Sequence, residues 1–237
     1  MPPPARPFLD EVGARPRRLR IGFTTTGAYG VALDPEIVAP TEATARLLAE
    51  LGHEVEEARF DLDMARIGPA FLAVYASGLA SGIGAAARLI GHEPQEGEIE
   101  AMTWNFWQIG KRVTAVQYLH AVVALQAASR NFANFFASRD VWLTPSLGSS
   151  PLPVGLIDFN DPATNFADPR IAGFALYNPL YNLSGQPAIT LPLHHSAAGL
   201  PIGMMFGARY AEEATLLNLA GQLEQALPWK DRRPALA

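Results

Sequence analysis

The sequence predicts an α/β fold, and three observations carry this prediction. A strand–helix–strand pattern spans residues 19–60, and two short apolar runs joined by a turn, Ala188–Leu193 and Ile202–Gly207, lie near the C-terminus. Of the 237 residues, 49% are hydrophobic and 17% are charged. A chain of this composition can bury a hydrophobic core, so an intrinsically disordered protein is excluded.

The N-terminal region is expected to begin with an extended lead-in, because Met1–Arg18 is rich in proline and arginine. Residues 19–237 are then expected to belong to one domain. Leu19–Thr24 is short and apolar, which predicts the first strand.

The helix that follows has clear boundaries. Asp34 lies at the N-cap position, Pro35 occupies the first helical position, and Gly52 stops the helix. Pro40 falls inside this helix and is expected to remove one backbone hydrogen bond or to kink it. Glu54–Phe60 is predicted as the second strand, and two strands joined through a helix are expected to pair in parallel.

The middle of the chain is predominantly helical. Helices are predicted over Ala65–Ile90, Glu96–Ile109 and Thr114–Ala137, followed by a third, buried strand at Val141–Thr144. Gly148–Pro169 holds several prolines and Asp or Asn residues and is predicted as a long loop. A loop of this length in a compact fold is typical of a functional or covering segment.

The C-terminal region is predicted as a hairpin followed by a helix. The turn Gly185-Gln186-Pro187 precedes the first apolar run, and the two runs are expected to form a hairpin buried on both faces. Acidic residues at Glu212 and Glu213 suit the first turn of a helix, and Pro228 ends it.

One segment has the length of a membrane span. Ile67–Ala87 contains 21 residues without a charge, and Gly78-x-x-x-Gly82 matches a helix-dimerisation pattern. Proline, glycine and serine dilute its hydrophobicity, so we expect a buried helix with small residues for close packing and no membrane partner.

Charge and cysteine content exclude further classes. The net charge is −5 without a basic stripe, so nucleic acid is not expected as a partner. The absence of cysteine excludes disulfides and cysteine-based zinc sites, and we expect no cofactor or metal. The first residues contain no apolar signal region, so we expect a cytoplasmic protein. The sequence leaves open whether the chain forms a homodimer.

Several segments, in order along the chain, resemble amidase-signature enzymes. The last and most specific is Tyr177–Glu224, which reads as an Asn-containing loop, a Gly-x-Pro-Ala turn, a strand, Gly-Leu-Pro-x-Gly, a second strand and a helix. The others are Leu19–Phe23 with Asp34-Pro35-Glu36, Leu51–Val55, and Asp140–Pro145. Pro153–Asp158 and the C-terminal Pro228-Trp229-x-Asp231-Arg232-Arg233-Pro234 resemble the 6-aminohexanoate-cyclic-dimer hydrolase type of amidase.

The resemblance implies the C-terminal part of the amidase-signature fold, with a mixed, mostly buried β-sheet flanked by helices. It also implies hydrolysis of linear or cyclic amide bonds by a Ser–Ser–Lys triad, in which a lysine acts as base through a bridging serine. In the family the triad lysine and the Gly-rich oxyanion loop lie in the N-terminal half. Here no Gly-Gly-Ser-Ser-Gly-Gly run is present, and the only lysines are Lys111 and Lys230. We therefore expect no catalytic residue in this chain, and inactivity of the chain alone.

Two pairs of adjacent residues have the residue types of a catalytic or metal-binding site, but their positions in the sequence do not suit either role. Ser149-Ser150 follows the Thr-Pro strand instead of lying in a Gly-rich loop, so we interpret it as structural. His194-His195 are adjacent on a predicted strand and should point to opposite faces, which does not suit one metal ion.

Six residues are candidates for binding a small-molecule amide substrate. Thr144 and Pro145 end a strand, where α/β sheets place ligands. Asn178 and Asn182 lie in the loop that the family places near its active site, with satisfaction of loop backbone as the structural alternative. Trp104 and Tyr75 are candidates for a pocket wall, although helical aromatics more often belong to the core.

Three hypotheses about function remain open. The chain is the C-terminal portion of an amidase whose N-terminal half is missing, one chain of a two-chain amidase, or a non-catalytic binding or regulatory module with an amidase-like fold. The DNA immediately upstream distinguishes them, because it would encode the Gly-Gly-Ser-Ser-Gly-Gly segment in frame, in a separate gene, or not at all.

Overall fold

The computed structural model describes residues 3–14, 16–28, 31–61, 63–161, 163–164, 168–174 and 176–233. The chain divides into two compact units. The first unit comprises Met1–Phe60, Asn131–Pro151 and Gly173–Ala237, and the second comprises Asp61–Arg130 and Leu152–Ala172. Pro234 of the C-terminal motif and parts of the long loop lie outside the described residues.

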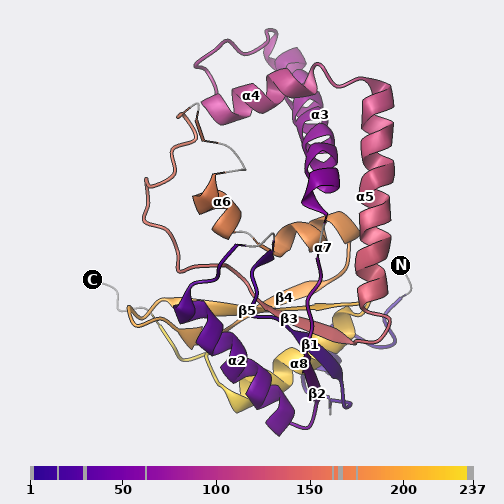
Figure 1. Ribbon diagram of the computed structural model, residues 1–237, viewed down its shortest axis with the longest axis vertical. Helices are drawn as coiled ribbons and strands as arrows, with labels where there is room; N and C mark the ends of the chain where they lie inside the picture. Colours follow the sequence, from indigo (N-terminus) through magenta and orange to yellow (C-terminus); the bar gives the residue numbers. More distant parts are fainter. Residues whose placement is uncertain are drawn as a thin grey trace. The chain divides into compact units, whose positions relative to one another are not determined.

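The first unit is built on a five-stranded mixed sheet (Figure 1). Its strands are β1 (Arg20–Phe23), β2 (Glu54–Glu57), β3 (Val141–Pro145), β4 (Ala188–His195) and β5 (Pro201–Ala208), in the order β2-β1-β3-β5-β4. Strand β1 pairs in parallel with both β2 and β3, whereas β5 pairs antiparallel with β3 and β4. The predicted parallel pair and the predicted hairpin are both confirmed.

The connection between β1 and β2 is helix α2 (Pro35–Glu50), as the sequence predicts. The Asp34 carboxylate accepts a hydrogen bond from the Glu36 N–H (2.9 Å), which caps the helix. Gly52 adopts a positive φ of 97° directly after the helix, where a residue without Cβ avoids strain. Pro40 is accommodated within the helix, and its carbonyl accepts a hydrogen bond from the Thr44 hydroxyl (3.0 Å).

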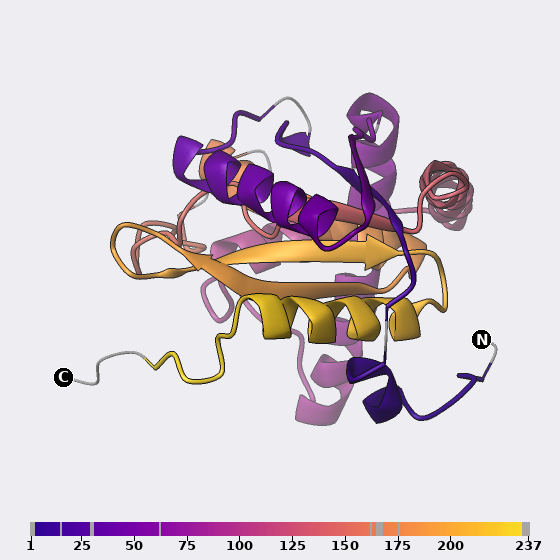
Figure 2. The ribbon, with the colours of Figure 1, turned by 90° about the horizontal axis from the view of Figure 1, so that it is seen from below.

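One face of the sheet carries the main hydrophobic core. Helices α2 and α8 (Glu213–Ala226) cover this face (Figure 2). The strand residues on it alternate along each strand, as expected for a period of two. The core comprises Leu19, Ile21, Ile37, Ala45, Leu48, Val141, Leu143, Leu191, Leu193, Ile202, Met204, Phe206, Ala208, Leu216, Leu219 and Leu223.

The other face is covered by aromatic side chains around Trp142. Its indole N–H donates to the Ala58 carbonyl (2.9 Å), and its ring contacts Phe132, Phe135 and Tyr177 edge-on. Phe132 and Phe135 come from the end of α5 (Ala115–Phe135), and Tyr177 precedes α7 (Asn178–Ser184). We call this the aromatic face of the sheet.

Two expectations about the first unit are wrong. The lead-in contains a short helix, α1 (Phe8–Val12), which packs on α8 because the Asn218 amide donates to the carbonyls of Glu11 (3.2 Å) and Ala14 (2.8 Å). The whole lead-in was expected to be extended because it is rich in proline, but the segment Phe8–Val12 itself contains no proline. The hairpin is also not buried on both faces: β5 is mostly buried, but alternate residues of β4 such as Thr190 are exposed.

Within the described residues, β4 is an edge strand that pairs with β5 alone. Its outer side thus presents backbone groups that no other described strand pairs with. Pro192 lies inside β4, and the register shifts between Leu191 and His194. An edge strand tolerates proline because one side of its backbone has no ladder partner.

The second unit contains α3 (Met64–Ile90), α4 (Ala101–Gly110) and most of α5. Helices α3 and α4 approach closely at Gly110, where an added Cβ would lie 2.0 Å from the Ala76 carbonyl oxygen. The sequence predicts this helix over Glu96–Ile109, whereas in the structure it begins later, at Ala101. The long loop is anchored to α4, since the Met102 N–H donates to the Phe159 carbonyl (2.9 Å).

Helix α3 has the length and composition that crossing a membrane requires. It has 27 residues, and its most apolar window has a mean hydropathy of 1.5 and is 17% buried. The expected burial of this helix is wrong, since 17% of the window is buried and an added Cβ at Gly78 or Gly82 would meet nothing within 4 Å. One helix that meets these criteria of length and composition is weak evidence for a membrane span. The absence of a membrane partner stays a prediction.

Candidate substrate-facing site

The carboxyl end of β3 places hydroxyl groups on the aromatic face of the sheet. Thr144 is fully buried, and its Oγ1 has no hydrogen-bond partner within the part of the chain that the structure describes. Both Thr144 and Thr190 of β4 are in register with Met205, so their side chains share this face. The Ser146 hydroxyl donates to the Thr190 hydroxyl (3.2 Å) in an exposed position.

Gly203 makes this approach of Ser146 and Thr190 feasible. A Cβ on Gly203 would lie 2.8 Å from both the Ser146 Oγ and the Thr190 Cγ2. Because such contacts are shorter than real Cβ contacts, a side chain here would displace the hydroxyl pair. The arrangement offers donors and acceptors that can bind a polar ligand.

Helix α7 brings a further unsatisfied hydroxyl to the same face, and the turn after α7 carries an unsatisfied amide oxygen. The Tyr181 hydroxyl lies over Gly207, where an added Cβ would meet it at 2.1 Å, and Gly207 is in register with Trp142. Neither this hydroxyl nor the Gln186 Oε1 has a hydrogen-bond partner among the described residues, although the Gln186 Nε2 donates to the Ala208 carbonyl (3.0 Å). Desolvation by complete burial, with a smaller effect of Tyr177, raises the pKa of Tyr181 far above its ordinary value.

Asn178 and Asn182 lie on α7, so the expected loop at Tyr177–Pro187 is wrong. Pro179 starts this short helix, and Gly185 ends it with a φ of 70°. Its buried residues Leu180 and Tyr181 face the sheet, whereas Asn178 and Asn182 are exposed. Helix α7 and the Thr144 side chain thus share a face of the sheet, and a substrate contact of either asparagine stays a prediction.

Pro145 ends β3 in register with Met204 and is buried on the core side. Its side chain therefore points away from the aromatic face that carries Thr144. Within β3, Thr144 is the residue whose polar atom faces the candidate site.

Tyr75 and Trp104 lie in the second unit, on α3 and α4. The Tyr75 ring is partly exposed and contacts Phe106 edge-on at 5.4 Å between centroids. Trp104 contacts the buried Trp107 at 5.1 Å. Both side chains thus lie at the edge of the α3–α4 packing and remain partly exposed to solvent. This position is compatible with the wall of a pocket and with the edge of the hydrophobic core.

The adjacent serines have structural partners. The Ser150 hydroxyl donates to the Glu36 Oε2 (3.0 Å), and the Ser149 hydroxyl donates to the Ser150 carbonyl (3.2 Å). The Glu36 Oε1 also accepts the Ala197 N–H (2.7 Å). Glu36 thereby links the segment after β3 and the β4–β5 turn to the start of α2. The Glu36 carboxylate is thus engaged in structural hydrogen bonds to both segments, and neither lysine contacts these serines among the described residues.

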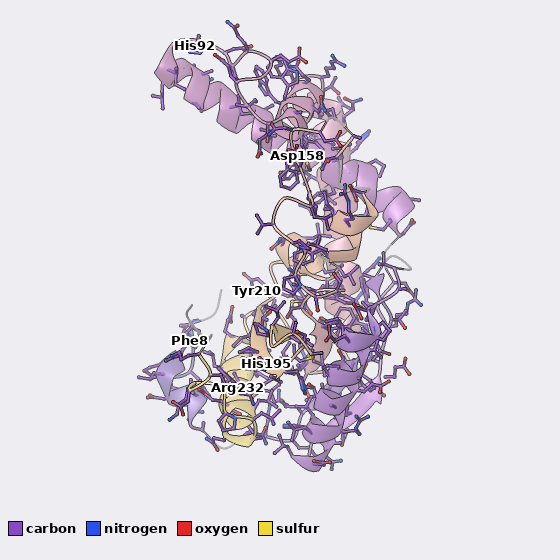
Figure 3. The ribbon with its side chains drawn as sticks, turned by 90° about the vertical axis from the view of Figure 1, so that its left-hand side faces the viewer. Phe8, His92, Asp158, His195, Tyr210 and Arg232 are labelled. Atoms are coloured by element: carbon purple, nitrogen blue, oxygen red, sulfur yellow. The ribbon has the colours of Figure 1, made fainter. Side chains whose placement is uncertain are left out.

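The adjacent histidines bind different partners. The His194 Nε2 lies 2.8 Å from the Thr44 Oγ1 on α2. The exposed His195 Nδ1 lies 2.9 Å from the Arg232 Nη1. Figure 3 labels His195 and Arg232 near the C-terminal end of the chain. Desolvation, with the positive charges of Arg232 and His195, lowers the pKa of His194. In the described parts of the chain no three His, Asp or Glu side chains gather at a metal-binding distance.

Neither lysine contacts a serine among the described residues. The Lys111 Nζ lies over the Trp107 ring (3.7 Å) and near the Glu93 carboxylate (3.7 Å), and Lys230 is exposed. The described part of the chain therefore presents polar groups at the end of β3 without a lysine in contact with a serine.

Sequence reasoning missed Tyr181 and Gln186. Both lie within the segment that carries the family resemblance, but a tyrosine between Leu180 and Asn182 reads as an ordinary core aromatic. The signal that identifies them is an unpaired buried polar atom, which only the fold reveals.

Comparisons with known proteins agree with this architecture. The Amidase family model matches residues 1–217. The putative amidase AmiC of Mycobacterium leprae is 33% identical over 231 residues, covering 96% of this chain and 48% of that protein. The 6-aminohexanoate-cyclic-dimer hydrolase of Paenarthrobacter ureafaciens is also 33% identical, over 248 residues that cover 99% of this chain and 49% of the hydrolase.

Solved structures give the same result. The structure of 6-aminohexanoate cyclic dimer hydrolase complexed with substrate superimposes with a TM-score of 0.88 at 28% identity, covering 99% of this chain and 50% of that one. A bacterial aryl acylamidase of the amidase-signature family shares the fold, with a TM-score of 0.74 at 22% identity. The chain spans about half the length of the relatives it matches. From its sequence and its fold alike, the chain belongs to the amidase family.

Proposed function

We propose that this chain is the C-terminal portion of an amidase that hydrolyses linear or cyclic amide bonds through a Ser–Ser–Lys triad outside the chain. The observation that carries the proposal is the coverage: nearly all of this chain matches about half of each relative. The absence of a serine–lysine contact in the described residues supports it, since the triad needs a lysine that acts as base on a serine.

In this proposal the chain supplies the substrate side of the site. Thr144, Tyr181 and Gln186 present unpaired polar atoms that could bind the polar groups of a small amide or of the catalytic half. Asn178 and Asn182 extend this set on α7. A role of Tyr75 and Trp104, in the second unit, in binding a substrate is a separate proposal. The protein would act in the cytoplasm without a cofactor.

Activity measurements test the first half of the proposal. The purified 237-residue chain should not cleave aryl amides or 6-aminohexanoate oligomers. Turnover that disappears in Ser149→Ala or Ser150→Ala would reveal a nucleophile in this chain and overturn the proposal. Turnover that survives both changes would point to a different nucleophile and would equally contradict it.

The upstream DNA tests the second half. An in-frame segment encoding Gly-Gly-Ser-Ser-Gly-Gly would support a single longer enzyme, and a neighbouring gene encoding it would support a two-chain amidase. If neither is present, the alternative is favoured: a binding or regulatory module that retains the fold without catalysis. The edge strand β4, with backbone groups free for pairing, is the observation that favours a partner chain over a self-sufficient module.

A further inference from the structure

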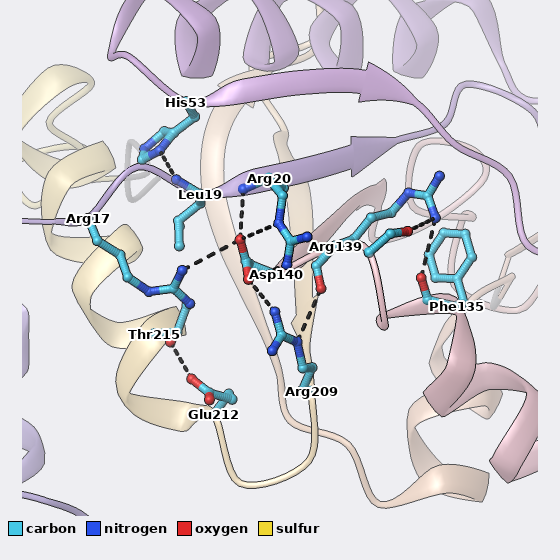
Figure 4. Close-up of polar contacts among 11 residues, drawn as sticks. Arg17, Leu19, Arg20, His53, Phe135, Arg139, Asp140, Arg209, Glu212 and Thr215 are labelled. Carbon is cyan, nitrogen blue, oxygen red and sulfur yellow. Dashed lines mark hydrogen bonds and ion pairs between the residues drawn. The ribbon is translucent and has the colours of Figure 1, made fainter.

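Five arginines gather at the end of the sheet opposite to Thr144. Arg17 precedes β1, Arg20 begins it, and Arg209 follows β5, and all three contact Asp140, which precedes β3 (Figure 4). Arg18 and Arg139 flank this group. In a chain with a net charge of −5, this is a local concentration of positive charge.

Both carboxylate oxygens of Asp140 already have several hydrogen-bond or ion-pair partners. Its Oδ2 accepts the Arg20 backbone N–H (2.9 Å) and Nε (3.3 Å) and lies 3.5 Å from the Arg17 Nη1, and its Oδ1 accepts from the Arg20 Nη2 (3.3 Å) and the Arg209 Nη2. A carboxylate offers about four lone-pair directions. Burial raises the pKa of Asp140, but the hydrogen bonds and charge of Arg20 and Arg17 outweigh it and hold the pKa below its usual value.

The guanidinium groups keep unused donors toward solvent. Each has five N–H donors, of which Asp140 can accept only a few. The Asp140 side chain is 5% exposed, whereas those of Arg17, Arg20 and Arg209 are 57%, 46% and 41% exposed. The carboxylate therefore lies beneath three cations whose outer faces are accessible.

Nearby acids do not neutralise this excess. Glu54 pairs with Arg18 (3.1 Å) and Glu56 pairs with Arg139 (2.8 Å), so the five arginines face three carboxylates at contact distance. Glu54 also lies close enough to contribute to the raised pKa of Arg20, behind the larger effect of Asp140. The Glu212 carboxylate, in the same view, accepts the Thr215 hydroxyl (2.6 Å) (Figure 4). Among the groups in ion-pair contact, five guanidinium groups face three carboxylates, which leaves two positive charges. Glu212 keeps its own negative charge and forms no ion pair with these arginines among the described residues.

We propose that Arg17, Arg20 and Arg209 form a binding site for an oxyanion with two negative charges, namely a phosphate group. Guanidinium forks match phosphate oxygens in geometry and form charge-assisted hydrogen bonds. A phosphate monoester carries close to two negative charges at neutral pH, which matches the uncompensated charge. A monocarboxylate would neutralise only half of it. The site is independent of the proposed amidase chemistry.

Calorimetric titration of the 237-residue chain with inorganic phosphate tests the site, at constant ionic strength and slightly alkaline pH. Saturable one-to-one binding is expected, with acetate binding at least about tenfold more weakly because it brings one charge. No saturable binding at millimolar phosphate to a chain that circular dichroism shows to be folded would overturn the proposal. Equal binding of acetate would also overturn it.

A matched pair of variants tests the residues. Arg17→Gln removes the outermost cation, while Arg20 and Arg209 still satisfy Asp140, so the fold should persist. Arg18→Gln removes the same charge from a residue paired with Glu54 and 68% exposed. Phosphate affinity should fall by about tenfold in Arg17→Gln and by less than about twofold in Arg18→Gln. An equal loss in both variants would mean nonspecific attraction and would refute the site.

Discussion

Two tyrosines on the same face of the sheet should respond in opposite directions to removal of their hydroxyl groups. Tyr177 and Tyr181 are both buried, one turn apart at α7. The Tyr177 hydroxyl donates to the Thr26 carbonyl, whereas the Tyr181 hydroxyl is buried without a partner among the described residues. We expect Tyr177→Phe to destabilise the protein and Tyr181→Phe to stabilise it.

The magnitudes follow from the cost of burying polar groups. An intramolecular hydrogen bond contributes about 1 kcal/mol, and a buried unpaired hydroxyl costs about 1–3 kcal/mol. Because phenylalanine keeps the ring packing of each site, Tyr177→Phe should lower the free energy of unfolding by about 1 kcal/mol, since the Thr26 carbonyl loses the hydrogen bond from the Tyr177 hydroxyl. Tyr181→Phe should raise the free energy of unfolding by about 1 kcal/mol, or about 2–4 °C in Tm for a chain of this size.

Urea titration followed by circular dichroism measures both variants under identical conditions. The m-value should stay unchanged, since neither change alters the surface exposed on unfolding by much. A loss of stability in Tyr181→Phe as large as that in Tyr177→Phe would show that the Tyr181 hydroxyl has a partner in the folded protein. That result would remove Tyr181 from the candidate site.

Three further changes have defined outcomes. His53→Ala should cost about 1–3 kcal/mol in urea titrations, because the buried Leu19 N–H loses its acceptor Nδ1 (3.2 Å) and the Gln222 Oε1 loses its contact with Nε2 (2.8 Å). For His194, desolvation lowers the folded pKa, so its contribution to stability is complete above about pH 6.5, the ordinary value, and declines as the pH falls from there through the folded pKa. Stability measured across this range should decline less steeply in His194→Gln, and an identical profile would contradict the assignment. Gly110→Ala should separate α3 from α4, since its Cβ would lie 2.0 Å from the Ala76 carbonyl oxygen, and a Tm unchanged within about 1 °C would argue against that packing.

The strands and the first long helix could be predicted because their boundaries are local. Asp34 and Gly52 fix the ends of α2 through backbone geometry that the sequence states directly. The pairing of β1 with β2 then follows from the connection through a helix. The ends of these elements are determined by residues adjacent in the sequence, so they can be predicted from the sequence alone.

The errors arise where tertiary contacts decide. Helix α7 is too short for a periodic signal, and it exists because Tyr181 and Leu180 pack on the sheet before Gly185 ends it. Helix α1 is equally short, and contacts with Asn218, more than two hundred positions away, hold it on α8. The burial of β4 could not be predicted because it depends on which strand lies at the edge, and the sheet order places β4 there.

For the candidate site, the sequence identifies the place but not the polar atoms that define it. Thr144 was predicted from its position at the end of a strand, and its hydroxyl is buried on the aromatic face without a partner among the described residues; its contact with a substrate stays a prediction. An unpaired buried hydroxyl costs free energy, so Thr144 and Tyr181 each lower the stability of this chain relative to an apolar residue of similar shape. Buried polar groups that the fold leaves unsatisfied are expected where a ligand or a second chain supplies the missing partner. This cost, together with the edge position of β4 among the described strands and the match to half of each relative, supports our proposal that this face of the sheet carries the substrate side of an amidase.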